Sequence, residues 1–149
     1  MQIHCLTDIT VESPDELIEK LSDVASRITG HPKDEILTSL RERERLSSTA
    51  IGKGVMLPHI RVDEIEADYI FFLKLDNPLK YVSPDGVDIS FVFFIMSPLE
   101  KKTEYLRLVS SIVKMIKNES IYSQIRDVHN SEELKKVIQD NLLVKGITN

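Results

Sequence analysis

Apolar residues near the N-terminus recur at helical spacing between clear start and stop signals. Ser13 and Pro14 fit a helix start, because serine caps the first backbone N–H groups and proline suits the first turn. Gly30 is a typical helix end. The apolar residues between these signals lie three or four positions apart and would form one buried face: Leu17, Ile18, Leu21, Val24, Ala25 and Ile28. The pattern predicts a helix between Ser13 and Gly30.

The same spacing predicts four further helices. One begins after Pro32, a second runs from about Lys101 to Lys117, and two more have Asn118 and Ser131 as their N-caps. The apolar residues expected to face the core lie on one side of each helix: Ile36, Leu37 and Leu40 in the first, Leu106, Val109, Val113 and Ile116 in the second, and Leu134, Val137 and Ile138 in the last.

Two short segments, Tyr69 to Leu75 and Ile89 to Met96, are almost continuously apolar and rich in β-branched and aromatic residues. Such segments are typical of strands that are buried on both faces. Turn-forming residues separate them, at Asn77-Pro78 and at Ser83 to Gly86. Helices at both ends of the chain and buried strands between them predict an α/β fold, a layered α/β/α sandwich whose mixed, mostly buried central sheet is flanked by helices. The pattern leaves the strand order open.

Length, composition and charge narrow the class of protein. The 149 residues suit a single domain, 1–149, and 42% hydrophobic with 29% charged residues is an ordinary globular balance. The net charge of -5 argues against nucleic acid as the main partner. One cysteine, Cys5, excludes an internal disulfide and fits a reducing compartment. With no secretory signal pattern and no apolar run long enough to enter a membrane, we expect a cytoplasmic protein.

Arg43 is the first candidate for chemistry. It lies three residues after Leu40 and seven after Ile36, so it continues the apolar face of its helix. A charged group on that face needs a charged or polar partner, because an unpaired buried charge is costly. The alternative is that the aliphatic stem of Arg43 packs on the helix while the guanidinium reaches water.

The segment after this helix contains two glycines and a proline–histidine pair. Gly52 and Gly54 would let the backbone approach an anion closely, or would simply form a tight turn before a strand. Pro58 stiffens the backbone beside His59, although a lone histidine is more often structural or exposed than reactive. A metal site is disfavoured because the available ligands have unrelated spacings: His4, Cys5, His31 and His59.

Taken together, these residues resemble the signature of the phosphotransferase-system enzyme IIA domain of type 2, the fructose, mannitol and nitrogen-related family. The matching groups are Arg43-Glu44, Ser48-Thr49, Gly52 to Gly54 and Pro58-His59. The resemblance continues over nearly the whole chain, through Asn77-Pro78, Asp85 to Asp88, Phe91 to Pro98, the helix near Thr103 and Ser131 to Leu134.

The resemblance implies a phosphoryl carrier. His59 would accept phosphate from HPr, a small carrier that is itself phosphorylated on histidine, and would pass it to the cysteine of a IIB component. Arg43 would supply positive charge, and Thr49 would donate its hydroxyl to the phosphate, assisted by backbone amides near Gly52 to Gly54. A neutral imidazole is nucleophilic near pH 7, and transfer between two protein histidines requires neither a metal nor a cofactor.

Two positions depart from the family pattern. Met56 occupies a position that is usually alanine, where it would either crowd the pocket or pack inward. Tyr105 occupies the position of a second histidine that many members carry at the start of the helix after the second buried strand. Tyrosine can donate a hydrogen bond to phosphate but adds no positive charge, and the alternative is a core tyrosine with its hydroxyl at the rim. If the second histidine matters for rate, transfer is slower here.

Three functions follow from the resemblance. The leading hypothesis is a IIA component of fructose or mannitol type in sugar transport. The alternative is a regulatory module of nitrogen-related type, whose docking to other proteins is switched by phosphorylation of His59. The third, an inactive remnant, is disfavoured because Arg43 and His59 are both intact. The partner surface should be small and centred on His59, and Arg61 could contribute to it.

Overall fold

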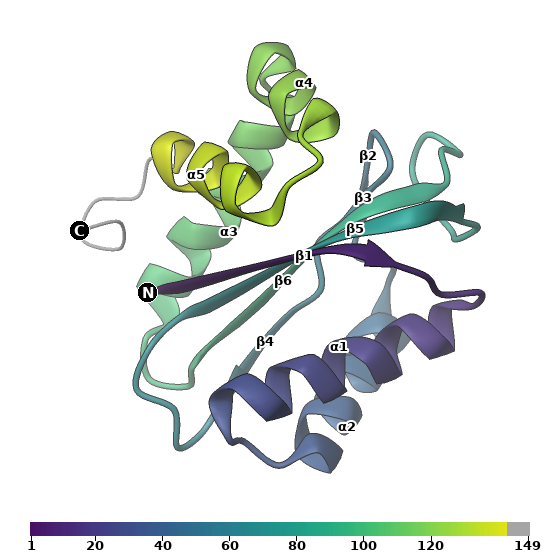
Figure 1. Ribbon diagram of the computed structural model, residues 1–149. Helices are drawn as coiled ribbons and strands as arrows, with labels where there is room; N and C mark the ends of the chain where they lie inside the picture. Colours follow the sequence, from purple (N-terminus) through teal and green to yellow (C-terminus); the bar gives the residue numbers. More distant parts are fainter. Residues whose placement is uncertain (143–149) are drawn as a thin grey trace.

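The computed structural model describes residues 1–142, so residues 143–149 of the predicted single domain lie outside the described part (Figure 1). Strands and helices follow one another in this order: β1 (Gln2–Ile9), α1 (Pro14–Thr29), α2 (Lys33–Leu46), β2 (Ala50–Gly52), β3 (Val55–Met56), β4 (His59–Val62), β5 (Tyr69–Leu79), β6 (Ile89–Pro98), α3 (Lys102–Lys117), α4 (Glu119–Asp127) and α5 (Ser131–Asn141).

The strands form one mixed sheet in the order β1-β5-β6-β3-β2, and β4 also pairs with β6. Strands β1 and β5 are parallel, β5 and β6 are antiparallel, and β3 and β4 both run parallel to β6. The register is the same for both, since Met56 pairs with Val92 and His59 pairs with Ile95. Strands β3 and β4 therefore form one line along β6, interrupted only at Leu57 and Pro58.

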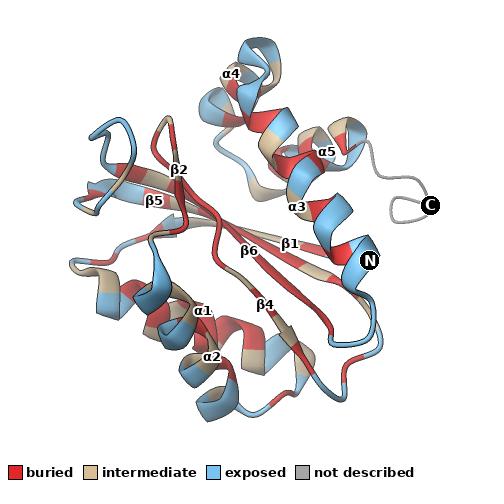
Figure 2. Ribbon diagram, turned by 180° about the vertical axis from the view of Figure 1, so that it is seen from behind, coloured by how far each residue is buried: buried red, intermediate tan, exposed pale blue. Residues whose placement is uncertain are grey.

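Helices cover both faces of this sheet, as the sequence predicts. Helices α1 and α2 pack on one face, and α3, α4 and α5 lie on the other (Figure 1). Alternate residues of β6 enter the two cores: Val92, Phe94 and Met96 on the α1–α2 side, and Phe91, Phe93 and Ile95 on the α3–α5 side. The central strands are buried on both sides (Figure 2), which confirms the α/β/α sandwich.

The helix signals are confirmed with one small shift. The Ser13 hydroxyl accepts the Glu16 backbone N–H at 3.1 Å, and Gly30 ends α1 with a left-handed φ of 79°. Asn118 caps α4 as predicted. The cap of α5 is Asn130 rather than Ser131, because the Asn130 side chain accepts the N–H groups of the first turn. Two neighbouring residues could serve as the cap, and the pattern selected the wrong one.

Of the four residues predicted to face the core from α3, Ile116 is buried, Val109 and Val113 are partly buried against the core, and only Leu106 is wrong. The residues of α3 that are buried are Tyr105, Leu108, Ser111, Ile112, Met115 and Ile116, whereas Leu106 is 54% exposed. This helix carries two overlapping apolar stripes, and sequence spacing alone does not rank them. Packing against the aromatic residues of β5 and β6 selects the stripe that contains Tyr105.

The sequence pattern misses four strands. Strand β1 alternates too weakly to stand out, although Ile3 and Ile9 are buried. Strands β2, β3 and β4 have only three, two and four residues, which is too short for a periodic signal. Within residues 1–142, no helix has the length and apolar character needed to cross a membrane.

Candidate functional site

His59 is the first residue of β4, and its imidazole lies on the α3 side of the sheet. The Pro58 carbonyl accepts the Ile95 N–H at 3.0 Å, so pairing with β6 is kept on the N-terminal side of the histidine. The His59 Nδ1 lies 2.7 Å from the Leu57 carbonyl oxygen. A carbonyl can only accept a hydrogen bond, so Nδ1 must carry the proton. In the neutral ring the lone pair is therefore on Nε2.

The surroundings of His59 favour this neutral form. Burial lowers the pKa of His59 below its usual value of 6.5, and the positive charge of Arg43 lowers it further. The hydrogen bond to Leu57 and the negative charge of Glu44 act in the opposite direction. Since burial is the largest effect, the ring holds an unprotonated Nε2 at neutral pH.

Arg43 lies in the last turn of α2 and is only partly buried. Its Nη1 donates to the Ser47 carbonyl at 3.0 Å, where α2 ends. The sequence predicts that Arg43 continues the inward helix face, and the structure places its charge close enough to influence the pKa of both His59 and Tyr105. A guanidinium has five N–H donors, so the bond to Ser47 leaves capacity to bind an anion.

Tyr105, in the first turns of α3, lies next to His59. The two ring centroids are 5.8 Å apart, and the rings are tilted by 49°. Burial raises the pKa of Tyr105 to about 12, partly opposed by the charges of Arg61 and Arg43. The phenol therefore keeps its proton at neutral pH and can donate a hydrogen bond to an anion on His59.

Thr49 is buried and bound to Glu44. The Thr49 hydroxyl donates to the Glu44 carboxylate, and the Thr49 backbone N–H does so at 3.3 Å. The Tyr81 hydroxyl donates to the same carboxylate, which together with burial raises the pKa of Tyr81. This network joins the end of α2 to the start of β2. Sequence reasoning missed Glu44 and Tyr81 as a pair, and the one available signal was the position of Glu44 beside Arg43.

The glycine pair forms a tight hairpin turn between β2 and β3. Lys53 and Gly54 have φ angles of 58° and 77°, and Gly52 pairs with Val55 across the turn. The Lys53 backbone N–H donates to Asp85 Oδ2 at 2.8 Å, so a carboxylate of the protein already occupies this amide. The Lys53 ammonium also forms an ion pair with Glu119 of α4 at 2.5 Å. The observed geometry is that of the tight turn.

Met56 faces away from His59. It is 1% exposed and belongs to the core on the α1–α2 side of the sheet. His59 pairs with Ile95, which belongs to the core on the other side. Of the two alternatives that the sequence leaves open for Met56, the structure shows inward packing.

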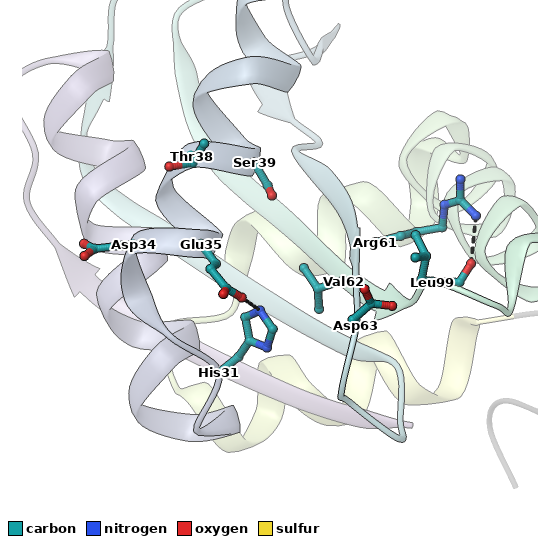
Figure 3. A pocket seen from close by; sticks show the side chains of 9 residues that line it. All are labelled: His31, Asp34, Glu35, Thr38, Ser39, Arg61, Val62, Asp63 and Leu99. Carbon is teal, nitrogen blue, oxygen red and sulfur yellow. Dashed lines mark hydrogen bonds and ion pairs between the residues drawn. The ribbon is translucent and has the colours of Figure 1, made fainter.

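An open pocket of ≈ 470 Å³ lies next to the His59 site, between α2 and β4 (Figure 3). His31 and Glu35 line one side of it and form an ion pair of 2.9 Å when His31 is protonated. Arg61 lines the other side, and its Nη1 donates to the Leu99 carbonyl at 3.0 Å. The Arg61 guanidinium carbon is also 5.7 Å from the centre of the Tyr105 ring. Arg61 thus connects this pocket with the His59 site.

The four residues considered as metal ligands, His4, Cys5, His31 and His59, do not lie together in the structure. Within residues 1–142, no three histidine, cysteine, aspartate or glutamate side chains form a group that could hold a metal ion. His4 and Cys5 lie in β1, and His31 precedes α2 on the opposite side of the sheet from the ring of His59. The chemistry available at the site is therefore that of an imidazole, two guanidinium groups and a phenol.

Comparison with known proteins identifies the family. The family model described as "Phosphoenolpyruvate-dependent sugar phosphotransferase system, EIIA 2" matches residues 2–141. A nitrogen regulatory protein from Bradyrhizobium diazoefficiens is 26% identical over 133 residues, which cover 89% of this chain and 87% of that protein.

Solved structures show the same fold. Nitrogen regulatory protein IIA-Ntr from Neisseria meningitidis superposes with a TM-score of 0.85 and 26% identity, covering 91% of this chain and 92% of that chain. The complex of enzyme IIAMTL with phosphorylated enzyme IIBMTL from Escherichia coli gives a TM-score of 0.74 at 12% identity, covering 92% and 94%, and supports the fold alone. With a family model that spans almost all of its described residues, the chain belongs to the EIIA type 2 family of the phosphotransferase system.

Proposed function

We propose that this protein is a cytoplasmic phosphoryl carrier in which His59 Nε2 accepts the phosphoryl group of a phosphohistidine on an HPr-like carrier. The observation that supports this most is the bond from Nδ1 to the Leu57 carbonyl, because it directs the only basic nitrogen of the ring away from its own backbone. The lowered pKa of His59 keeps that nitrogen unprotonated at neutral pH. Family membership supports the same role.

The transfer step is balanced without a separate acid or base. The lone pair of Nε2 attacks phosphorus, a new P–N bond forms, and the P–N bond of the donor histidine breaks. The donor ring, protonated on its other nitrogen, leaves as a neutral imidazole, and the positive charge passes to the ring of His59, which keeps its own Nδ1 proton. His59 retains the hydrogen bond to Leu57 throughout. Since the transition state is loose, the protein mainly positions the ring and stabilises the three phosphoryl oxygens.

Arg43 and Tyr105 are proposed to bind those oxygens. Arg43 contributes a positive charge at the end of α2, and Tyr105 contributes a protonated hydroxyl on α3. Thr49 can join them only after its hydroxyl leaves Glu44. No metal or cofactor enters the step.

After His59 is phosphorylated, the phosphoryl group either acts as a switch on His59 or passes to a IIB cysteine. Similarity to proteins named nitrogen regulatory proteins supports a regulatory module, whose docking to protein targets is switched at His59. The family description, which names sugar phosphotransferase, supports transfer to a IIB cysteine in fructose or mannitol transport. Of the two, the higher identity to the nitrogen regulatory proteins favours the regulatory module.

Phosphorylation can be tested with labelled phospho-HPr from the same organism. We expect acid-labile label on the wild-type protein and on the His129→Ala variant, which removes an exposed histidine outside the site, and none on His59→Ala. Equal labelling of His59→Ala and the wild type would contradict the proposal.

The destination can be tested with the labelled protein itself. Mixing it with the purified IIB proteins of the organism should leave the label in place if the protein is a regulatory module. A target protein should then be captured by only one of the two forms, phosphorylated or unphosphorylated. Rapid transfer of the label to a IIB cysteine would instead assign the protein to sugar transport.

A further inference from the structure

The charge balance around His59 is incomplete for a phosphorylated ring. A phosphoryl group carries a charge of about -2 near neutral pH. The charged groups that influence the pKa of His59 are Arg43, with one positive charge, and Glu44, with one negative charge. These two cancel, and Tyr105 contributes no charge because its pKa of about 12 keeps it protonated. The phosphorylated ring, which keeps its Nδ1 proton, carries one positive charge, so one negative charge of the phosphoryl group still lacks a cation.

Arg61 is placed to supply it. Arg61 and His59 are two residues apart on β4, so both side chains project from the same face of the strand. Their Cβ atoms are therefore about 7 Å apart along the strand, within the reach of an arginine side chain. Tyr105 lies between the two, with its ring centre 5.8 Å from that of His59 and 5.7 Å from the Arg61 guanidinium carbon.

The present contacts of Arg61 can be exchanged. Its side chain is only partly buried, and its bond to the Leu99 carbonyl, at 3.0 Å, lies at the rim of the open pocket (Figure 3). The residues facing this guanidinium from the packed elements are Tyr105 of α3 and the Leu99 backbone after β6. A doubly charged phosphoryl group is a stronger acceptor than a neutral carbonyl, since hydrogen bonds between charged groups are about twice as strong.

We propose that Arg61 is a second phosphate-binding residue, which leaves the Leu99 carbonyl and binds the phosphoryl oxygens when His59 is phosphorylated. The ring of Tyr105 guides the guanidinium toward His59, so that Arg43 and Arg61 hold the phosphoryl group from two sides. In this way an arginine on β4 supplies the positive charge that a histidine at position 105 would otherwise provide. The inference rests on the proposed role of His59.

The test compares variants at position 61 in phosphorylation by phospho-HPr. Arg61→Met should lower kcat by about 10- to 100-fold with little change in KM, because it removes a contact made only to the transferring group. Arg61→Lys should recover part of that loss. Arg107→Met, which removes an exposed arginine of α3, is the control for lost positive charge at a partner surface and should retain the wild-type kcat.

A second readout separates phosphate binding from a packing role. In ³¹P NMR of the phosphorylated protein, Arg61→Met should raise the pKa of the phosphoryl group, because a nearby cation favours its dianion. The loss in kcat should also be smaller when Arg61→Met is combined with Tyr105→His, which adds a second imidazole.

Two results would overturn the assignment. A rise in KM with unchanged kcat would make Arg61 a docking residue, and equal losses in the Lys and Met variants with an unchanged phosphoryl pKa would make it a packing residue. Failure of the proposed function is distinguishable, because the wild-type protein would then gain no phosphate on His59 at all.

Discussion

The two halves of the segment from Gly52 to His59 are built for different purposes. The hairpin tip, Gly52 to Gly54, is held in place by contacts within the protein. The Lys53 backbone N–H donates to Asp85, and the Lys53 ammonium forms an ion pair with Glu119. The backbone is also packed closely, since a Cβ on Gly54 would lie 3.0 Å from the Asp88 carbonyl oxygen. The His59 ring is held by its Nδ1 bond to the Leu57 carbonyl and lies beside the Tyr105 ring, and Nε2 is the nitrogen available for chemistry. A single sequence motif thus contains a structural half and a reactive half.

Glycines beside a reactive residue in the sequence therefore need not bind its substrate. The backbone amide at the tip is occupied by Asp85, whereas the cations that can serve His59 come from α2 and β4. Changes at the tip should therefore act on stability, and changes around His59 should act on phosphoryl transfer.

The largest expected effect is at the reactive half. His59→Gln removes the nucleophile and should lower the rate of phosphorylation by more than about a thousandfold. The free energy of unfolding should change by less than about 1 kcal/mol, because the side chain is half-exposed. Phosphorylation kinetics and urea unfolding of the same preparation check both parts. A variant that unfolds readily would show that His59 is part of the stabilising core.

Arg43→Met should lower the phosphorylation rate by about a hundredfold, because it removes positive charge from the transferring group. The same change should raise the pKa of His59, since Arg43 lowers it in the wild type. As the pH is lowered, the phosphorylation rate of the variant should therefore begin to fall at a higher pH than that of the wild type. NMR titration of the His59 ring and a pH–rate profile measure these effects. Arg45→Met, at an exposed position of the same helix, is the control and should change neither quantity.

At the structural half, Gly54→Ala should destabilise the protein by about 2 to 3 kcal/mol, through its left-handed φ of 77° and the close Asp88 carbonyl. Gly86→Ala is a matched control, because its φ is 72° but its Cβ would meet no atom within 4 Å; we expect about 1 kcal/mol there. Below its melting temperature, Gly54→Ala should still accept phosphate at the wild-type rate. Loss of phosphoryl transfer in the folded variant would show that the hairpin tip takes part in the reaction, against this prediction.

Thr49→Val should give the smallest change in transfer, about two- to threefold, because the Thr49 hydroxyl proton is donated to Glu44 in the resting structure. The loss of that bond should cost about 1 kcal/mol of stability. Ser48→Ala, at the neighbouring residue, allows the two hydroxyls to be compared in the same kinetic assay. A tenfold or greater loss for Thr49→Val would place its hydroxyl on the phosphoryl group.

The sequence predicted the sandwich because its central strands are long and apolar and its helices have strong end signals, such as Ser13 and Gly30. It missed β2, β3 and β4, whose few residues carry no periodicity, and so it could not show that β3 and β4 continue each other along β6. The wrong placement of Leu106 on α3 has a related cause, since two apolar stripes overlap and only tertiary packing distinguishes Leu106 from Leu108.

For the site, the sequence named His59, Arg43, Thr49 and Tyr105. The structure places Arg43 and Tyr105 near His59, and the Thr49 carbonyl accepts the Leu57 N–H at 2.9 Å. Hydrogen-bond partners were beyond the reach of the sequence. The bond of Thr49 to Glu44 and the position of Arg61 beside Tyr105 depend on side-chain directions that no spacing encodes.

The most direct test is a long-range ¹H–¹⁵N correlation spectrum of the protein after phosphorylation by phospho-HPr, which identifies the phosphorylated residue and the ring nitrogen. The hydrogen bond between Nδ1 and the Leu57 carbonyl predicts phosphate on Nε2 of His59, with Nδ1 still protonated. Phosphate on Nδ1, or on any residue other than His59, would contradict the account.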